Sequence, residues 1–196
     1  MTPKQEESIR DKISKIKKAL AADKRQWGGF YHDGPGLRYL PPELFLKLKD
    51  YKRALHYFRW FDKNFPDDCG YPIFLFEWTM TLFKTGKIKE AEKKALQTFI
   101  SNTYLFDKFF GKEMLNFDKY EGSNWEKEDL TYNLVYSKEQ EDIQDFVDWL
   151  NQFLESDKFY KIANEFIDIE QQLKIEPVGK KRDALVNRCY HLLDET

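Results

Sequence analysis

The 196-residue sequence has few of the residues that mark several protein classes. Its two cysteines, Cys69 and Cys189, are far apart, which argues against a disulfide framework or a thiolate metal site. Glycine and proline number only nine and seven, a scarcity typical of helical proteins. No apolar run reaches the roughly 18 residues that a membrane span needs, and the N-terminus has no signal-peptide core. We therefore expect a cytoplasmic protein with no membrane span.

The chain also lacks a strong net charge. Its formal value is −2, which provides no overall attraction for nucleic acid or for an anionic membrane. The charge is nevertheless uneven, because residues 1–25 carry eight basic and four acidic side chains, whereas residues 112–176 carry seven basic and seventeen acidic ones. We interpret both segments as solvated helix faces.

Aromatic and charged residues are abundant instead. Phe, Tyr and Trp make up 17% of the chain and recur every three or four residues, which is the spacing of one helix face. Charged residues make up 34%, enough to cover the outer faces of such helices. The sequence predicts an all-α fold, and its length fits a single domain over residues 1–196.

Residues 1–36 are predicted to form an N-terminal helix and a Gly-rich loop. Thr2 and Pro3 suit a helix start, since Thr caps free N–H groups and Pro fits the first turn. The helix has an apolar stripe, expected to pack on the rest of the chain, of Ile9, Ile13, Ile16 and Leu20. Off the stripe lie Lys12, Lys15, Lys17 and Lys18. The loop, residues 27–36, lacks the terminal Gly-Lys-Ser/Thr of a phosphate-binding loop, and its aromatic residues are expected to cover the core.

Two helical-hairpin patterns follow one another within residues 37–111. The first reads LKLKDYKRALHYFRWFDKNFPDD and the second reads LFKTGKIKEAEKKALQTFISNTY. Each has a turn position, Lys49 or Gly86, followed five residues later by a small residue, Ala54 or Ala91. The two turn positions are 37 residues apart. This pattern resembles the tetratricopeptide repeat (TPR), whose period is about 34 residues.

The resemblance implies a right-handed superhelical array of antiparallel helix pairs, with atypical capping helices at both ends. In this family the first helix of each pair lines a concave groove that receives a peptide or a partner helix. The corresponding positions are Tyr39, Glu43 and Lys47 in the first pair and Phe76, Met80 and Lys84 in the second. Family members that bind acidic C-terminal tails have Lys and Asn in this groove, so the resemblance argues against that ligand here.

Residues 112–196 are predicted to form a connector and C-terminal capping helices. The connector residues expected to dock on the repeats are Leu115, Phe117, Tyr120, Trp125 and Leu130. Capping and apolar periodicity predict helices that begin at Ser137, at Ser156-Asp157 and near Lys181. Such helices would cover apolar surface at the end of a repeat stack.

Signals for catalysis are weak. The chain has only three histidines, His32, His56 and His191, none of them in a close metal-ligand spacing. His56 is interpreted as a partly buried packing residue. No nucleophile elbow, dinucleotide-binding fingerprint or catalytic cysteine context is present. We predict no enzyme, and therefore no catalytic residue, metal site or cofactor.

The sequence therefore predicts a non-catalytic protein–protein interaction module. Its expected partner is a protein or a peptide, while the partner's identity and the oligomeric state stay open. This hypothesis predicts that Tyr39, Phe76 and Met80 are accessible to solvent. The alternative is binding of nucleic acid or a membrane surface by the basic N-terminal helix, which predicts salt-sensitive association through its lysines.

Overall fold

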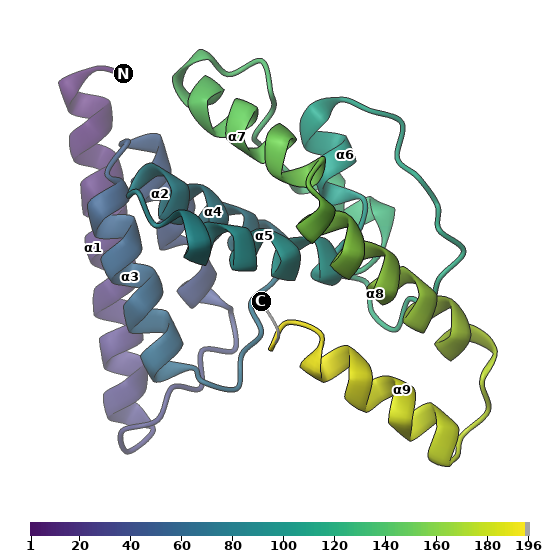
Figure 1. Ribbon diagram of the computed structural model, residues 1–196. Helices are drawn as coiled ribbons and strands as arrows, with labels where there is room; N and C mark the ends of the chain where they lie inside the picture. Colours follow the sequence, from purple (N-terminus) through teal and green to yellow (C-terminus); the bar gives the residue numbers. More distant parts are fainter. Residues whose placement is uncertain (195–196) are drawn as a thin grey trace. The chain divides into compact units, whose positions relative to one another are not determined.

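The computed structural model describes residues 1–194. Their regular secondary structure consists of helices, and no β-strand occurs among them. This confirms the predicted all-α class. The chain divides into two compact units, Met1–Lys87 and Ile88–Thr196, which are described separately below. The expectation of a single domain stays a prediction. Figure 1 labels the helices of both units.

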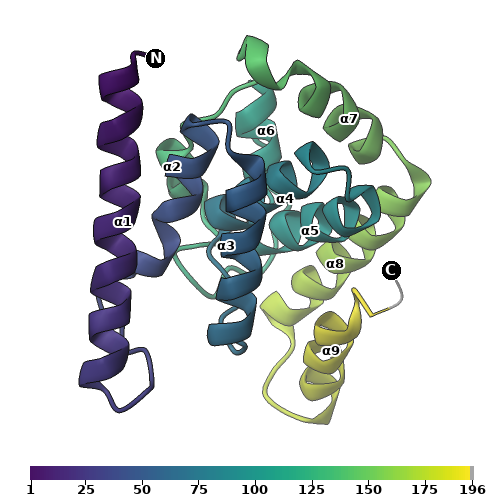
Figure 2. The same cartoon turned by 90° about the vertical axis from the view of Figure 1, so that its left-hand side faces the viewer.

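The first unit begins with the long helix α1 and ends with α4. Its elements are α1 (Pro3–Gln26), the 3₁₀ helix η1 (Leu37–Tyr39), α2 (Pro41–Lys47), α3 (Tyr51–Asn64) and α4 (Pro72–Lys84). The predicted start of α1 is confirmed, because the Thr2 side chain accepts from the Gln5 N–H and the Gln5 side chain accepts from the Thr2 N–H. Figure 2 shows α1 and α3 running in roughly the same direction, with α2 between them.

The Gly-rich segment 27–36 is a loop, as predicted, but most of its aromatic residues do not cover the core. Trp27 and Phe30 are 50% and 79% exposed. Tyr31 alone folds back, and its ring lies 5.6 Å from that of Trp60 and 4.9 Å from that of Phe65. Local glycine content predicted the loop, whereas the direction of each ring depends on contacts far along the chain.

A buried polar network fixes this loop to the rest of the unit. The Asp33 carboxylate accepts from the Leu37 and Arg38 N–H groups and pairs with the Arg38 guanidinium at 3.0 Å. Arg38 also donates to Asp68 at 2.7 Å, and the Tyr57 hydroxyl donates to the Arg38 carbonyl at 2.9 Å. Since Asp33 is buried, this pairing compensates the loss of its hydration.

The two predicted turn positions share one backbone geometry. Lys49 and Gly86 both have positive φ, 54° and 75°. Each turn closes with two backbone hydrogen bonds of 2.8–2.9 Å, donated by Lys49 and Asp50 in the first and by Gly86 and Lys87 in the second. The same pair of bonds ends a helix of the second unit at Gly111, so it marks helix ends in general.

The core of the first unit is aromatic. The Phe58 and Trp78 rings stack at 4.9 Å, and Phe61 lies 4.6 Å from Phe74. Ala54 is fully buried, so its small side chain leaves space for these rings. Helix α4 is buried from Pro72 to Leu82, and the buried side chains are apolar except for Glu77, Thr79 and Thr81.

The second unit contains α5 to α9. Its elements are α5 (Ile88–Ser101), α6 (Leu105–Phe110), the 3₁₀ helices η2 (Glu128–Asn133) and η3 (Glu141–Ile143), α7 (Gln144–Leu154), α8 (Asp157–Ile175) and α9 (Lys180–His191). The predicted Ser156 cap of α8 is confirmed by its hydrogen bond with the Phe159 N–H. The helix predicted from Ser137 begins later, because the η3 turn precedes α7.

The connector of the second unit is held mainly by polar contacts. Of the five residues expected to dock, Leu115, Tyr120 and Trp125 are 54%, 42% and 45% exposed, so they are not buried as a docked apolar surface would be, whereas Phe117 and Leu130 are partly buried. Instead the buried Asn102 side chain donates to the carbonyls of Trp125 and Lys127, at 2.7 and 2.9 Å. Buried polar groups of this kind must find partners, and the connector's backbone supplies them.

Apolar packing joins the helices of the second unit. Phe99 of α5 lies 5.2 Å from Phe159 of α8, edge to face. Helix α9 packs on α8 through a smaller cluster, in which Leu185 meets Ile169 and Leu173. The helix pair α8 and α9 is therefore held by its own apolar seam.

Candidate functional site

Two of the predicted groove residues are inaccessible. Phe76 and Met80 are 0% and 1% exposed, which contradicts the expected accessibility of both side chains. The reason is that burial extends around the whole of this mostly apolar helix, including Glu77, Thr79 and Thr81, rather than along one face. Neither residue lines an open groove.

Tyr39 is partly buried and has a structural role. Its hydroxyl donates to the Asp68 carboxylate at 2.7 Å, and its ring lies 5.2 Å from Phe74. Burial, together with the hydrogen bond to Asp68, raises the pKa of Tyr39 to about 12. The side chain belongs to the polar network of Asp33 and Arg38, and its hydroxyl points to a partner within the chain.

The other three predicted groove residues, Glu43, Lys47 and Lys84, make separate contacts. Glu43 and Lys47 form an ion pair with each other, one turn apart on α2. Lys84 lies with its ammonium 5.6 Å from the centre of the Tyr51 ring, and it borders a surface hollow. The structure therefore does not bring the six predicted residues together, and of these six Lys84 lines one of the three hollows described next.

The first unit has three adjoining surface hollows, each of which is lined by residues of both α1 and α3. The central hollow, about 430 Å³, is lined by Arg10, Ile13, Ser14, Lys17, Lys18, Ala21, Phe45 and Arg53. The aromatic hollow, about 200 Å³, is lined by Lys17, Leu20, Ala21, Tyr31, His56, Tyr57 and Trp60. The lysine hollow, about 720 Å³, is lined by Arg10, Leu48, Lys49, Asp50, Tyr51, Lys52, Leu55, Lys84 and Thr85. Shared residues connect the three, which together we name the α1–α3 groove.

The α1–α3 groove is basic. Seven of its lining residues are Lys or Arg, and within residues 1–194 its lining includes one carboxylate, that of Asp50. Asp50 accepts from the Arg53 N–H as the cap of α3, and it lies 3.8 Å from the Arg10 guanidinium and 3.5 Å from that of Arg53. One carboxylate therefore serves two cations, and positive charge remains in excess.

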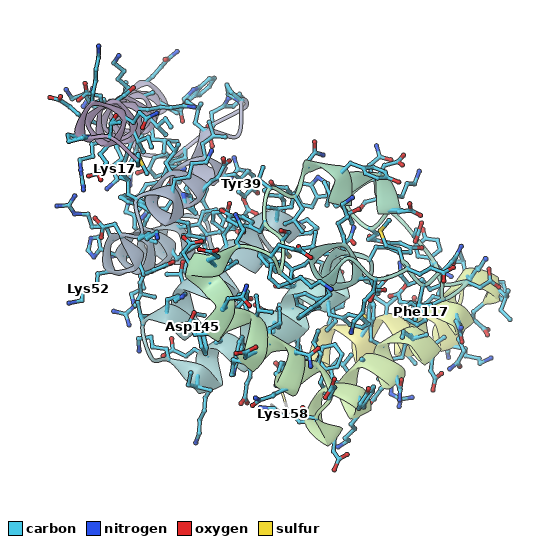
Figure 3. All side chains as sticks on the ribbon, turned by 90° about the horizontal axis from the view of Figure 1, so that it is seen from above. Lys17, Tyr39, Lys52, Phe117, Asp145 and Lys158 are labelled. Carbon is cyan, nitrogen blue, oxygen red and sulfur yellow. The ribbon has the colours of Figure 1, made fainter. Side chains whose placement is uncertain are left out.

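Lys17 lies where the central and aromatic hollows meet. Its ammonium is 5.5 Å from the centre of the Phe45 ring and 5.8 Å from that of Tyr57, within cation–π range. Figure 3 shows Lys17 between α1 and the helix that carries Lys52. Partial burial and the neighbouring charge of Arg53 lower the pKa of Lys17.

The aromatic hollow is formed by rings from the loop and from α3. Tyr31 meets Trp60 edge to face at 5.6 Å, and Tyr57 lies 5.0 Å from Trp60. His56 borders this hollow and is exposed, so its interpretation as a partly buried packing residue is wrong. The hollow combines apolar walls with the positive charge of Lys17 at its edge.

Sequence reasoning missed this groove, although α1 carries a signal for it. Arg10, Ser14, Lys17 and Ala21 recur at spacings of four, three and four residues, which places them on one helix face beside the apolar stripe. On that face the small side chains of Ser14 and Ala21 leave space for a hollow, and Arg10 and Lys17 make it basic. The partner face of α3 is not adjacent in sequence, so the pattern on α1 alone did not predict the groove.

Other chemistry has little support in the described structure. No group of three or more His, Cys, Asp or Glu side chains is placed to hold a metal ion in residues 1–194. Burial, with the nearby Glu170 carboxylate, raises the pKa of the Cys189 thiol to about 12, which disfavours the reactive thiolate. Over the same residues, no helix combines the length and apolarity required to cross a membrane.

The fold and groove define an all-α protein with a basic surface site. In comparisons with family models, curated proteins and solved structures, no family, relative or structural neighbour matches this chain. The function is therefore argued from the groove itself.

Proposed function

We propose that this chain is a non-catalytic protein-interaction module that holds a peptide or helix of a partner protein in the α1–α3 groove. The observation that carries the proposal is the open groove itself, which has apolar residues such as Ile13 and Phe45 among basic ones. Binding surfaces of this kind offer apolar area for affinity and charge for orientation.

We further propose that α2 to α5 follow the TPR-like register predicted from the sequence. Ala54 and Ala91, which are both fully buried at the positions where small residues are expected, support it. The turns at Lys49 and Gly86, 37 residues apart, are compatible with it, but the same hydrogen bonds also end the helix at Gly111. In this proposal the partner binds beside α1 rather than at the six positions taken from the family.

A second candidate function is binding of nucleic acid or a membrane surface by α1. The observation in its favour is that Lys12, Lys15 and Lys18 are exposed, with no carboxylate paired to them in the described part of the chain. The aromatic hollow favours a protein partner instead, because a recess with the half-buried rings of Tyr31 and Trp60 in its walls can receive an apolar side chain, which a purely electrostatic surface does not need.

Blocking the groove tests the proposal. Ser14 is exposed and lines the central hollow, so Ser14→Trp should fill it with a large ring. Ser8 is exposed on the same helix and lines none of the three hollows, which makes Ser8→Trp a matched control. Both variants and the wild type would be used for affinity capture from native extract, followed by quantitative mass spectrometry.

We expect specific partner proteins to be captured by the wild type and by Ser8→Trp, and to be lost with Ser14→Trp. The proposal fails if Ser14→Trp captures the same proteins in the same amounts as the wild type. It fails equally if the wild type captures no protein above a bare-resin control.

A further inference from the structure

The chemistry of the partner segment follows from the charge of the α1–α3 groove. The groove presents seven Lys and Arg side chains against the single carboxylate of Asp50 among the lining residues that the structure describes. Arg10 already lies 4.0 Å from Glu6 and 3.8 Å from Asp50, so a neutral or basic segment placed here would leave chiefly the charges of Lys17 and Lys18 without a carboxylate, or would add repulsion. An acidic segment gains favourable interactions with Arg10, Lys17 and Lys18 along one face of α1.

The central hollow offers its occupant little apolar surface. Ile13 and Phe45 form its floor but are only 6% and 3% exposed, whereas Ala21 is exposed. The apolar contact of a bound segment is therefore expected mainly in the aromatic hollow, and its carboxylates in the central one. Amphipathic helices that bind in grooves place their apolar anchors three, four or seven residues apart.

The aromatic hollow supplies a site for one such anchor. Its volume is about 200 Å³, and its walls include Leu20, Tyr31, Tyr57 and Trp60. An apolar cavity of about 150 Å³ is large enough to bind benzene. One aromatic side chain therefore fits, and interface anchors of this type dominate binding energies. Since Lys17 borders both this hollow and the central one, a carboxylate close to the anchor would lie beside its ammonium.

We infer, on the basis of the proposed function, that the α1–α3 groove binds an acidic segment of a partner protein with one aromatic side chain of that segment in the aromatic hollow. Lys17 then contacts a carboxylate next to the anchor, and Arg10 and Lys18 contact carboxylates in the central hollow. The segment is recognised by charge along its length and by the ring at one end.

A protein segment suits the groove better than a nucleic acid does. Single-stranded nucleic acids bind by stacking bases on free aromatic faces. Here Tyr57 and Trp60 pack on each other at 5.0 Å, and the Lys24 ammonium lies 4.8 Å from the centre of the Tyr31 ring.

A library of random peptides displayed on phage tests the inference without a prior choice of ligand. The bait is the full chain, with Ser14→Trp as the blocked control. We expect the wild type to enrich peptides that carry several Asp or Glu residues and at least one Phe, Tyr or Trp, and Ser14→Trp to enrich none of them. Enrichment of neutral or basic peptides, of acidic peptides without an aromatic residue, or of no peptide would overturn the inference.

Fluorescence anisotropy with one selected peptide then tests the site. Charge reversal of both Lys17 and Lys18 to Glu should weaken binding roughly tenfold or more. The same reversal of Lys12 and Lys15, which lie on α1 but line none of the hollows, should change it by less than about twofold. If the Lys17 change unfolds the chain, Lys18→Glu alone alters an exposed groove residue and should still weaken binding. Equal weakening by both pairs would contradict a specific groove.

Two further measurements test the aromatic anchor of the peptide and nucleic acid as the alternative ligand. Replacing the peptide's aromatic residue with Ala should weaken binding about tenfold, and an unchanged affinity would overturn the role of the aromatic hollow. A thymidine oligonucleotide that binds more tightly than the peptide would overturn the protein partner in favour of nucleic acid. If acidic peptides fail while Ser14→Trp still abolishes partner capture, the proposed function stands and the acidic class is wrong.

Discussion

The Arg38 guanidinium lies 2.7 Å from the Asp68 carboxylate and connects two loops of the first unit. Arg38 follows the Gly-rich loop, and Asp68 lies between α3 and α4, 30 residues later. The same guanidinium pairs with Asp33, whose side chain is 1% exposed. Arg38 thus holds the loop that supplies Tyr31 to the aromatic hollow.

Removing this cation should strongly destabilise the first unit. Arg38→Met leaves the buried Asp33 carboxylate without its countercharge, and we expect a loss of about 3 kcal/mol in unfolding free energy. Arg53→Met is the control, because its side chain is 65% exposed and its pair with Asp50 should contribute less than about 1 kcal/mol. Urea unfolding of both variants checks this, and equal losses would contradict the structural role of Arg38.

Tyr39 should make stability sensitive to high pH. Burial and the hydrogen bond to Asp68 raise its pKa to about 12 from an ordinary value of 10.0. Its contribution is therefore complete below pH 10 and is lost as the pH rises through 12. Urea unfolding between these pH values should show a smaller decline for Tyr39→Phe than for the wild type. Parallel declines would show that Tyr39 does not titrate as described, since the other buried tyrosines are common to both proteins.

Overpacking at Ala54 should destabilise the core. Ala54 is fully buried beside a dense set of rings, so Ala54→Leu should cost about 1–3 kcal/mol in unfolding free energy. Ala22→Leu on the exposed side of α1 is the matched control and should change stability by no more than about 0.5 kcal/mol. Thermal and urea unfolding provide the measurement, and a neutral Ala54→Leu would show that the core has spare room.

The turn at Gly86 should require its left-handed backbone. At φ 75°, Gly86→Ala should cost about 1–2 kcal/mol through strain alone, because an added Cβ would meet no atom within 4 Å. Gly86→Asn should lose less, since Asn tolerates this conformation better than Ala. Chemical unfolding of both variants compares the two costs. Equal stability of Gly86→Ala and the wild type would contradict the turn geometry.

Local features of the sequence predicted much of the fold. The Thr2 cap and the Ser156 cap depend on residues within one turn of each other, and both agree with the structure. The helix expected from Ser137 failed because a 3₁₀ turn, Glu141–Ile143, intervenes before α7. Cap residues mark possible starts, and tertiary contacts decide which start is used.

The predicted groove was wrong at Phe76 and Met80, because burial depends on contacts between distant parts of the chain. Helical spacing assigned Phe76 and Met80 to one face of α4, but that helix is buried on every side. The mostly apolar composition of residues 72–82 already indicated a buried helix. The groove positions were instead assigned from the family resemblance. The α1–α3 groove, in contrast, depends on α1 and α3 lying together, which no single stretch of sequence specifies.

The central claim is that a partner segment binds between α1 and α3, and hydrogen–deuterium exchange tests it most directly. The full chain would be compared with and without a saturating acidic peptide selected from the library. We predict slower exchange in residues 10–21 and 53–60, which carry the central and aromatic hollows, and no change in α7 and α8. Slower exchange confined to residues 88–194, or no change in residues 10–21, would contradict the claim.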